Sequence, residues 1–416
     1  MKRRQDHAGF NGTVGRSCTG QQSRNAEESS PRPQVLVLTP YYPPAELAGG
    51  PARTLEAMIK QSSSNTLERV AVLTSAYDLG QSQIMDVITD EWTTRHRVAV
   101  KFVGGNAASH LCQISATRSL DPDFVYLNSF FHPVFSIFPV LLARMRWWNR
   151  AKLVLAPRGE LDPGALTHKR FKKQLFLRVS RLAKLHRKVT WHASTEAEAA
   201  NIRLIFPAAD IVVRENETLL PTEALPFVAP TTERRIAFLS RISHKKGLHR
   251  LLEALTHVET PLCLDIYGEA EDKGYAARCK DLAAKSPSHI NVRFLGALPH
   301  SQVLATMRNY DLMALPTAGE NFGHAIVESL CSGCPVMLPD STPWTDAAIS
   351  TGTLVRGTEP KRWVTALNDY AALDADSVLR RKQLAQQAYL TWRSSQVDQP
   401  TILDLLLEPR RPQKRT

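Results

Sequence analysis

Short apolar runs alternate along the chain with longer segments whose apolar residues recur every three to four positions. The runs predict strands near residues 34–39, 69–74, 98–103, 124–127 and 152–156 in the first half, and near 235–240, 262–267, 291–295, 311–315 and 334–338 in the second. Strands that alternate with amphipathic helices are typical of α/β layers. Because 416 residues with 43% hydrophobic content can bury two cores, we predict an α/β fold of two Rossmann-like domains.

The connection between the two domains is expected within residues 219–232, where three prolines interrupt any regular apolar pattern. A polar segment over residues 1–33, rich in Ser, Gln, Gly and Arg, is predicted to be a disordered tail. We therefore expect an N-terminal domain at 34–225 and a C-terminal domain at 226–390. The last section, 391–416, is predicted to hold a helix that packs back on the first domain, followed by a basic tail.

The segment 317–328 is the most informative part of the second half. It follows a short apolar run and enters a stretch with helical apolar spacing over residues 322–330. Asn321, Phe322 and Gly323 would therefore open a helix behind a buried parallel strand. Helix N-termini present unpaired N–H groups and partial positive charge, so a diphosphate would fit there, and Gly323 leaves room for its close approach.

Two carboxylates belong to this segment. Glu320 would lie on the loop before the helix and Glu328 about two turns into it, which places the carboxyls about 10 Å apart. That distance suits holding two ends of an extended ligand, with Glu320 near a sugar ring and Glu328 near ribose hydroxyls. The alternative is an N-terminal acid that favours the helix dipole and a solvated surface Glu.

A second loop carries cations that suit phosphate groups. Arg241 and Lys246 follow an apolar run and precede leucines at helical spacing, so both would project from one strand-to-helix loop. The planar fork of Arg and the compact charge of Lys suit the two phosphates of a nucleotide leaving group. The alternative is a solvated basic turn.

Taken in order, these features resemble the retaining glycosyltransferases of family 4, which have the GT-B fold. The ordered set is Arg241 with Lys246-Gly247, Gly268 after the run 262–267, Phe294 to Leu298, Glu320 to Glu328, Gly333-Cys-Pro-Val336, and Pro343-Trp344. In the first half, residues 35–44 with Gly49-Gly50 and Arg53 resemble the first strand and glycine loop of that family. Residues 156–160 with Ala165-Leu166 resemble members that build bacterial surface polysaccharides, and the likeness covers about residues 34–395.

The resemblance implies a cleft between the two domains, with the donor bound by the second. It implies a catalytic set in which Arg241 and Lys246 hold the diphosphate of a UDP- or GDP-linked sugar and Glu320 holds the sugar itself. Glu328 would hold the ribose, and the backbone of 295–298 would meet the base. Further donor contacts are implied for Gly50, Gly268, Leu298, Asn321, Phe322 and Gly323. Members of this family retain the anomeric configuration, by attack on the face that the leaving group departs from.

The acceptor is expected in the N-terminal domain. Arg158 and Glu160 follow the apolar run 152–156 and are expected to contact the acceptor, the alternative being a salt bridge within a turn. Related enzymes often carry a His at the end of a strand in this domain, and His132 stands near such a position. A structural His is the alternative there.

Positive charge is concentrated in one part of the chain. Between Phe124 and Ser194 there are fourteen Lys and Arg residues, all within 144–188, and two acids, Glu160 and Asp162; the difference of +12 equals the whole formal charge of the chain. Within this segment, apolar residues at helical spacing mark one face, namely Phe171, Leu175, Val179, Leu182 and Leu185. Trp147 and Trp148 stand nearby among arginines.

A basic amphipathic helix with aromatic neighbours favours an anionic membrane surface, so we expect a lipid-linked or oligosaccharide acceptor to be delivered there. A solvated basic face is the alternative. Nucleic acid is a third candidate that no RNA- or DNA-binding motif supports. The apolar stretch 130–143 is too short to cross a bilayer, and no signal-peptide segment is evident, so we expect a cytoplasmic protein on the inner face of the plasma membrane.

No cofactor and no metal are expected. The six cysteines lack the spacing of a disulfide framework, and Cys331 and Cys334 are interpreted as packing residues. The segments that carry the expected donor site have no Asp-x-Asp motif, and Asp121 with Asp123 is interpreted as a turn in the other half. Arg241 and Lys246 would supply the positive charge that a divalent cation otherwise provides.

Three classes of function remain at this level. The first is a retaining, metal-independent glycosyltransferase that extends a lipid-linked glycan in polysaccharide biosynthesis. The second is a noncatalytic protein of the same fold that binds nucleotide-sugars or acts as a scaffold. The third is a nucleic-acid-binding protein that uses the basic segment.

Overall fold

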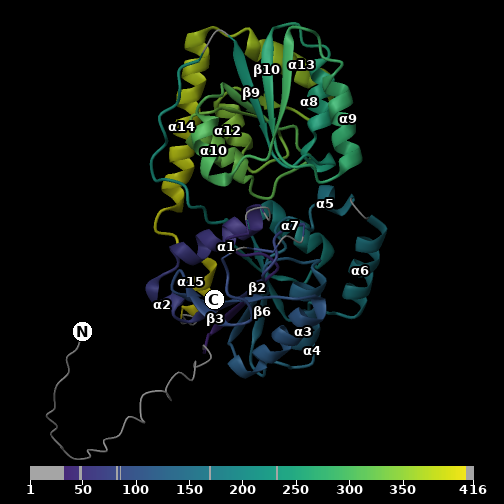
Figure 1. The fold of residues 1–416 in the computed structure, drawn as a ribbon, viewed down its shortest axis with the longest axis vertical. Helices are drawn as coiled ribbons and strands as arrows, with labels where there is room; N and C mark the ends of the chain where they lie inside the picture. The colour runs from purple at the N-terminus through teal and green to yellow at the C-terminus, as the bar shows by residue number, and fades with distance from the viewer. Residues whose placement is uncertain are drawn as a thin grey trace, which may run out of the picture.

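A computed structural model describes residues 32–45, 49–80, 83–84, 86–167, 170–230 and 233–408. Over these residues the chain forms two α/β domains, one above the other in Figure 1, with the N-terminal domain below. The predicted two-domain α/β fold is confirmed. The predicted tail at 1–33 and the predicted basic tail at the chain end lie almost wholly outside the described residues.

The N-terminal domain is built on an eight-stranded sheet of order β3-β4-β2-β1-β5-β6-β7-β8. All neighbouring strands are parallel except β3 and β4, which pair antiparallel. The strands are β1 Val35–Thr39, β2 Val70–Ser75, β3 Trp92–Arg95, β4 Val98–Val103, β5 Phe124–Leu127, β6 Lys152–Leu155, β7 Val189–Ala193 and β8 Asp210–Val213. The helices are α1 Gly50–Gln61, α2 Ser64–Leu67, α3 Ala107–Ala116, η1 Thr117–Leu120, η2 Pro133–Ile137, α4 Phe138–Arg144, α5 Pro163–Thr167, α6 Arg170–Leu182 and α7 Glu196–Ile205.

The apolar run of β1 explains why this strand lies inside the sheet. All five of its residues are buried, and successive side chains alternate between the two faces. Val35 and Val37 pack in one apolar cluster, whereas Leu36 and Leu38 pack in the cluster on the other face. A strand buried on both faces is therefore apolar along most of its length, with Thr39 as the polar residue at its end, as is typical of parallel sheets covered by helices.

The C-terminal domain has a six-stranded parallel sheet of order β11-β10-β9-β12-β13-β14. Its strands are β9 Arg234–Leu239, β10 Leu262–Tyr267, β11 Ile290–Gly296, β12 Leu312–Ala314, β13 Val336–Pro339 and β14 Leu354–Val355. Its helices are η3 His244–Lys246, α8 Leu248–Leu255, α9 Lys273–Ala283, α10 His300–Met307, α11 His324–Cys331, α12 Thr345–Ser350, α13 Pro360–Ala371 and α14 Ala375–Gln396, and a last helix, α15 Ile402–Leu407, follows.

The ten predicted strands are present within a few residues of their expected bounds, but four further strands were missed. These are β3, β7, β8 and β14, all at or next to a sheet edge. Edge strands such as β3 and β8 have mostly half-exposed residues, so they carry no continuous apolar run. β7 is buried but directly follows Arg187 and Lys188 and contains Thr190 and His192, so it has no continuous apolar run that would predict a strand.

The end of the chain crosses back between the domains. α14 lies along the C-terminal domain, where Tyr389 and Ala385 join its core. α15 then packs against α1 and α2, and Ile402 and Leu403 are buried in the core of the N-terminal domain (Figure 1). A hydrogen bond between the hydroxyls of Ser62 and Thr401, 2.8 Å long, fixes this return.

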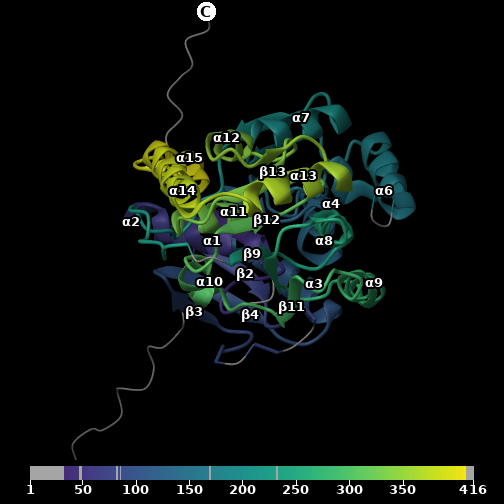
Figure 2. The ribbon, with the colours of Figure 1, turned by 90° about the horizontal axis from the view of Figure 1, so that it is seen from above.

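The basic segment contributes α6, which lies at the outer edge of the N-terminal domain in both Figure 1 and Figure 2. Leu177 and Ser180 are its buried residues. Four apolar side chains of the predicted face are exposed to solvent: Phe171 by 82%, Leu175 by 54%, Val179 by 51% and Leu182 by 83%. Among the described residues, no helix is both long enough and apolar enough to cross a membrane.

Candidate functional site

A cavity of about 510 Å³ lies between the two domains. Its walls come from the start of α1 and the loops after β6 and β8 on one side, and from the loops after β9, β10, β11 and β12 on the other. Ligands of parallel α/β sheets bind beyond the carboxyl ends of the strands, and both sheets present those ends to this cavity.

The predicted helix start lies in the cavity wall. α11 begins at His324, two positions later than expected, with Gly323 as its N-cap at φ 86°. This left-handed conformation favours glycine, and it turns the chain so that the first N–H groups of α11 lie at the cavity. Asn321 lines the cavity beside them, and its Oδ1 is buried without a hydrogen-bond partner among the described residues. Phe322 also borders the cavity but is only 4% exposed and packs against Trp344.

A glycine allows two loops of the C-terminal domain to meet at the cavity floor. Gly268 follows β10 with φ 151°, and a Cβ at this position would overlap the carbonyl oxygen of Ser240 after β9. The close contact brings the loop that carries Arg241 against the loop after β10. Any larger residue at Gly268 would separate the two loops, so a glycine is needed here for the packing of the cavity wall.

Lys246 and Glu320 form the most buried ion pair at the cavity. Lys246 Nζ donates to both carboxylate oxygens of Glu320, at 2.7 and 2.8 Å, and the two side chains are 18% and 7% exposed. Burial alone would raise the pKa of Glu320, but the charges of Lys246 and then Lys245 outweigh it and hold the pKa below its usual value. Glu320 is therefore a carboxylate at neutral pH, fixed by a cation from the neighbouring loop.

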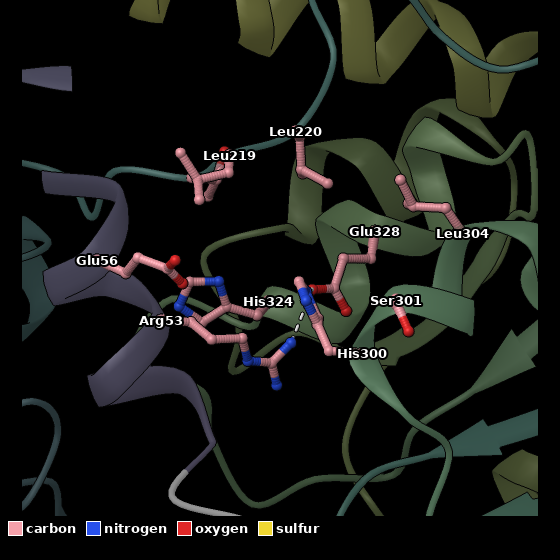
Figure 3. A pocket seen from close by; sticks show the side chains of 10 residues that line it. Arg53, Glu56, Leu219, Leu220, His300, Ser301, Leu304, His324 and Glu328 are labelled. Atoms are coloured by element: carbon pink, nitrogen blue, oxygen red, sulfur yellow. Dashed lines mark hydrogen bonds and ion pairs between the residues drawn. The ribbon is translucent and has the colours of Figure 1, made fainter. Parts of the chain in front are cut away.

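Glu328, on the second turn of α11, is bound by a cation from the other domain. Its Oε1 accepts from Arg53 Nη1 of α1 at 3.0 Å and lies 3.0 Å from His300 Nε2 at the start of α10. Figure 3 shows Arg53 reaching across the domain interface toward Glu328. Both pairs border a second cavity of about 170 Å³, which shares Arg53, His300, His324 and Glu328 with the larger one.

The remaining cations of the C-terminal wall are also paired. Arg241 Nη1 lies 3.3 Å from the carboxylate of Glu271, and both side chains are about half exposed. Lys245 Nζ lies 3.4 Å from Asp162 Oδ2 of the N-terminal domain. Two ion pairs, those of Lys245 and Arg53, therefore join the domains at the cavity.

The residues predicted for the acceptor are separated by the structure. Arg158 lines the cavity, whereas Glu160 and His132 do not. Glu160 accepts hydrogen bonds from the backbone N–H groups of Phe130 and Phe131, at 2.7 and 2.8 Å, so it holds the loop after β5. His132 caps η2, and burial lowers its pKa to about 4, so the ring is neutral and accepts from the N–H of Phe135.

Gly50 and Leu298 line the cavity as predicted for donor contacts. Gly50 lies so close to α11 that a Cβ on it would be 3.0 Å from His324 Cδ2. The hydroxyl of Thr54 lies 2.9 Å from His324 Nε2, one turn further along α1. Glycine here lets the start of α1 approach the start of α11.

Several cavity residues were not predicted from the sequence. Arg53 stands three residues after Gly50 and His324 directly after Gly323, so both lay inside the motifs that pointed to the site. Lys245 is adjacent to Lys246 in the same basic loop, so the sequence did not distinguish their roles. His300 and Asn216 belong to parts of the chain without a motif, so no local signal could identify them.

Among the described residues, no group of three or more His, Cys, Asp or Glu is placed to hold a metal ion. Cys331 and Cys334 are free thiols with no exposed surface, and both belong to the core of the C-terminal domain. Their position agrees with the packing role that was predicted.

A comparison with protein families finds a match for the second half of the chain. Residues 223–390 match the family described as glycosyl transferases group 1. Two curated relatives are D-inositol 3-phosphate glycosyltransferases. The protein of Corynebacterium urealyticum is 27% identical over 205 residues, which are 46% of this chain and 48% of that protein. The protein of Mycobacterium tuberculosis is 28% identical over 207 residues, which are 48% of this chain and 42% of that protein. The chain thus spans about half the length of the curated relatives it matches.

Solved structures resemble the chain over most of its length. Anabaena HepE in complex with UDP and glucose has a TM-score of 0.63 at 17% identity and covers 90% of this chain and 98% of its own. Sucrose-phosphate synthase from Thermosynechococcus elongatus has a TM-score of 0.63 at 13% identity, covering 86% and 94%. WaaG, a glycosyltransferase involved in lipopolysaccharide biosynthesis, has a TM-score of 0.60 at 14% identity, covering 90% and 100%. At these identities the likeness shows the fold, which confirms the predicted GT-B architecture.

Proposed function

We propose that this chain, whose residues 223–390 match the family of glycosyl transferases group 1, is a retaining glycosyltransferase that moves a monosaccharide from a nucleotide-sugar to a lipid-linked glycan. The observation that carries the proposal is the cavity between the domains. In it, the start of α11, the Lys246–Glu320 pair and the loop of Arg241 face the same space. A helix N-terminus beside two cations is suited to a diphosphate, and a fixed carboxylate beside it is suited to sugar hydroxyls.

The donor diphosphate would lie against the first N–H groups of α11, with Lys246 and Arg241 beside it. Both cations already have a carboxylate partner, so the phosphates would share them with Glu320 and Glu271. A UDP-linked donor is favoured because solved proteins of similar fold contain UDP and glucose or UDP-glucose. The half-buried Leu298 and the backbone of 295–298 would contact the base.

In the proposed reaction, the bond between the anomeric carbon and the donor phosphate oxygen breaks as the acceptor hydroxyl attacks the same face. The acceptor oxygen forms the new bond to the anomeric carbon, its proton passes to the departing phosphate, and the nucleoside diphosphate leaves. Negative charge develops on the diphosphate during this step. Cations and helix N–H groups held in place beforehand stabilise that charge without reorganisation, which lowers the barrier. Glu320 would orient the sugar through its hydroxyls.

Ribose binding at Glu328 would use the carboxylate oxygen that Arg53 and His300 do not contact. The Glu328 carboxylate is 5% exposed, and its Oε1 is already bound by Arg53 and His300. The ribose hydroxyls would donate to Oε2, which is the second acceptor oxygen of the carboxylate.

The acceptor would reach the site at a membrane surface on the side of α6. This helix has five cations and no acids, and its exposed face carries Phe171, Leu175, Val179 and Leu182. Such a surface is suited to the anionic inner face of a plasma membrane. Trp147 and Trp148 do not contribute, because Trp148 is buried and Trp147 packs under Arg118. This surface supports an enzyme of surface polysaccharide biosynthesis that is cytoplasmic and binds the membrane peripherally.

The experiment that tests the proposed function is incubation of the full chain with a panel of UDP-, GDP- and ADP-sugars and membrane lipid extract. We expect one sugar nucleotide to stabilise the protein against heat and to release its nucleoside diphosphate when the extract is present. Stabilisation without any turnover would instead indicate a noncatalytic nucleotide-sugar-binding protein. The absence of any stabilisation across the panel would contradict the proposed function.

Metal independence is a separate prediction. Lys246, Arg241 and the α11 N-terminus can supply the positive charge at the diphosphate, so excess EDTA should change the turnover rate by less than about twofold. The measurement is nucleotide release with and without chelator. A loss of activity in EDTA that Mg²⁺ or Mn²⁺ restores would show that a divalent cation takes part.

A further inference from the structure

Arg158 differs from the other cations of the main cavity. Five Lys and Arg side chains line it: Arg53, Arg158, Arg241, Lys245 and Lys246. Four of them each form an ion pair with a carboxylate, whereas no carboxylate among the described residues lies within ion-pairing distance of Arg158. Burial raises the pKa of Glu217, and the charges of Arg214 and Arg158 partly offset that rise, so Glu217 is an acid near Arg158 without being paired with it. A half-buried cation with no carboxylate in contact gains from an anionic ligand beside it.

The guanidinium of Arg158 is fixed by three neutral oxygen atoms. Nε donates to Asn128 Oδ1 at 2.8 Å, Nη2 donates to the hydroxyl of Tyr126 at 2.9 Å, and Nη1 donates to Asn216 Oδ1. The side-chain amide of Asn128 donates to the carbonyl of Pro51 at 3.2 Å, which leaves its oxygen facing Arg158. Three of the five N–H groups are thereby used, and none of these partners carries a charge.

The hydrogen-bond network extends from Tyr126 to His192 and the carbonyl of Arg214, and this carbonyl determines where the protons lie. His192 Nε2 lies 2.9 Å from the carbonyl of Arg214, and because a carbonyl can only accept, Nε2 carries the proton. Burial, followed by the charge of Arg158, lowers the pKa of His192 to about 3, so the ring is neutral and its Nδ1 accepts. The Tyr126 hydroxyl therefore donates to His192 at 2.7 Å and offers its lone pair to Arg158. This network orients the Arg158 guanidinium and supplies no negative charge.

The backbone at Arg158 is also held in an unusual conformation. Its φ is 53°, which is uncommon for a residue with a side chain and persists where the surroundings fix it. The next residue, Gly159, lies against the loop before α11, since a Cβ on it would be 2.8 Å from the Cβ of Asn321. Arg158 is thus presented from the N-terminal wall toward the loop of Glu320 and Asn321, beside which the transferred sugar would lie.

We propose that Arg158 is the anion-binding residue of the acceptor subsite, and that the acceptor carries a carboxylate or phosphate group close to the hydroxyl that is glycosylated. This inference rests on the proposed function and specifies the chemical class of its acceptor. The donor diphosphate has its own cations on the opposite wall. The guanidinium of Arg158 retains two N–H groups, which can bind one anionic group through two parallel hydrogen bonds.

The test uses the full chain and two matched pairs of small probes, with and without saturating UDP. One pair is methyl glucuronide and methyl glucoside, and the other is inositol 1-phosphate and inositol. We expect each acidic probe to bind about tenfold or more tightly than its neutral counterpart, measured by calorimetry, because hydrogen bonds to charged groups are the stronger ones. Arg158→Gln should abolish this preference and leave the affinity for UDP within about twofold.

Arg187→Gln is the matched control, because it removes the same charge from an exposed site outside the cavity and should keep the preference. Arg158→Lys keeps the positive charge without the planar guanidinium and should retain part of the preference for acidic probes. This variant provides the test if Arg158→Gln fails to fold. Equal binding of acidic and neutral probes by the wild type, including no binding of either, would overturn the inference. A loss of UDP affinity in Arg158→Gln as large as the loss for the acidic probes would also overturn it, by assigning Arg158 to the donor. Failure of UDP to bind the wild type would instead count against the proposed function.

Discussion

At the scale of single residues, the arrangement of Lys246 and Glu320 determines what each can do. Glu320 lies on the loop before α11 and Lys246 lies at the end of η3, 74 positions earlier in the chain. The pair holds the two loops together at the carboxyl ends of β9 and β12. A role for Glu320 in orienting the donor sugar therefore comes with a structural role, and a substitution will affect both.

We predict that Glu320→Gln lowers turnover by about 100-fold or more, because Lys246 loses its ionic partner and the sugar loses a charged hydrogen-bond acceptor. The same change should reduce the free energy of unfolding by about 2 kcal/mol, since Lys246 is left partly buried without a counter-charge. Turnover is measured by nucleotide release and stability by urea unfolding. A variant that keeps the wild-type rate would remove Glu320 from the site.

The pH dependence of stability provides a second measurement of the same pair. The pKa of Glu320 is held below its usual value of 4.5, so its contribution is present above that pH. It is lost as the pH falls through the lower pKa of the folded state, where the carboxyl takes up a proton. The difference in unfolding free energy between wild type and Glu320→Gln should stay constant above about pH 5 and shrink below pH 4.5. A difference that grows on acidification would contradict this assignment.

At the scale of elements, α6 shows that an apolar face predicted from spacing need not face a core. The repeat that places Phe171, Leu175, Val179 and Leu182 on one side is typical of a surface helix that packs inward. In the structure, Leu177 and the half-buried Phe176 make the contact with the domain, and the repeat itself lies in solvent. Exposed apolar clusters of this kind mark interaction sites.

We predict that the protein binds vesicles of phosphatidylglycerol and phosphatidylcholine, binds pure phosphatidylcholine vesicles weakly, and is released by high salt. Replacing Phe171 and Leu182 by Ser should lower the partition coefficient by about 10-fold or more, because each apolar side chain contributes about 1 kcal/mol or more on burial. Flotation with vesicles gives the measurement. Leu204→Ser is the control, because Leu204 is 78% exposed on α7 and lies outside the basic segment. Equal binding by the double variant would exclude α6 as the membrane contact.

At the scale of the whole molecule, the domains are joined by polar contacts at the cavity and by the returning helix α15. The contacts at the cavity are the Arg53–Glu328 pair, the Lys245–Asp162 pair and the Thr54–His324 hydrogen bond. Polar contacts of this kind can break and reform in water at low cost, whereas α15 buries Ile402 and Leu403 in the N-terminal core. Opening is therefore expected at the cavity, with α15 remaining attached to the N-terminal domain.

We predict that Arg53→Glu opens the cavity, because two carboxylates would then face each other at Glu328. A loss of about 1 kcal/mol would raise the open population about fivefold. Small-angle scattering without nucleotide should give a larger radius of gyration for this variant than for the wild type. Arg53→Lys, which keeps the charge, should retain the wild-type radius. An unchanged radius in Arg53→Glu would show that the domains are held together by other contacts.

The sequence by itself determined ten of the strands in the two sheets and the local form of the proposed donor site. A buried parallel strand is apolar at most positions, so β1, and β10 in spite of its buried Asp265, could be identified without any knowledge of their neighbours. The start of α11, with Gly323 and the two glutamates, is a feature of one short segment, and its geometry depends on residues next to each other in the chain. Local rules are sufficient in such cases because the partners are covalently close.

Only the tertiary structure decided which residues from distant segments meet. Arg53 and Glu328 are 275 positions apart, and Arg158 and Asn216 are 58 apart, so no spacing rule connects them. Glu160 was predicted to contact the acceptor, but it accepts backbone hydrogen bonds from the loop after β5, some 30 positions away in the chain. No local spacing rule connects these residues either. Periodicity shows which side chains share a face, but it does not show whether that face is covered. Coverage depends on the packing of whole elements, and in α6 that packing leaves the apolar repeat exposed.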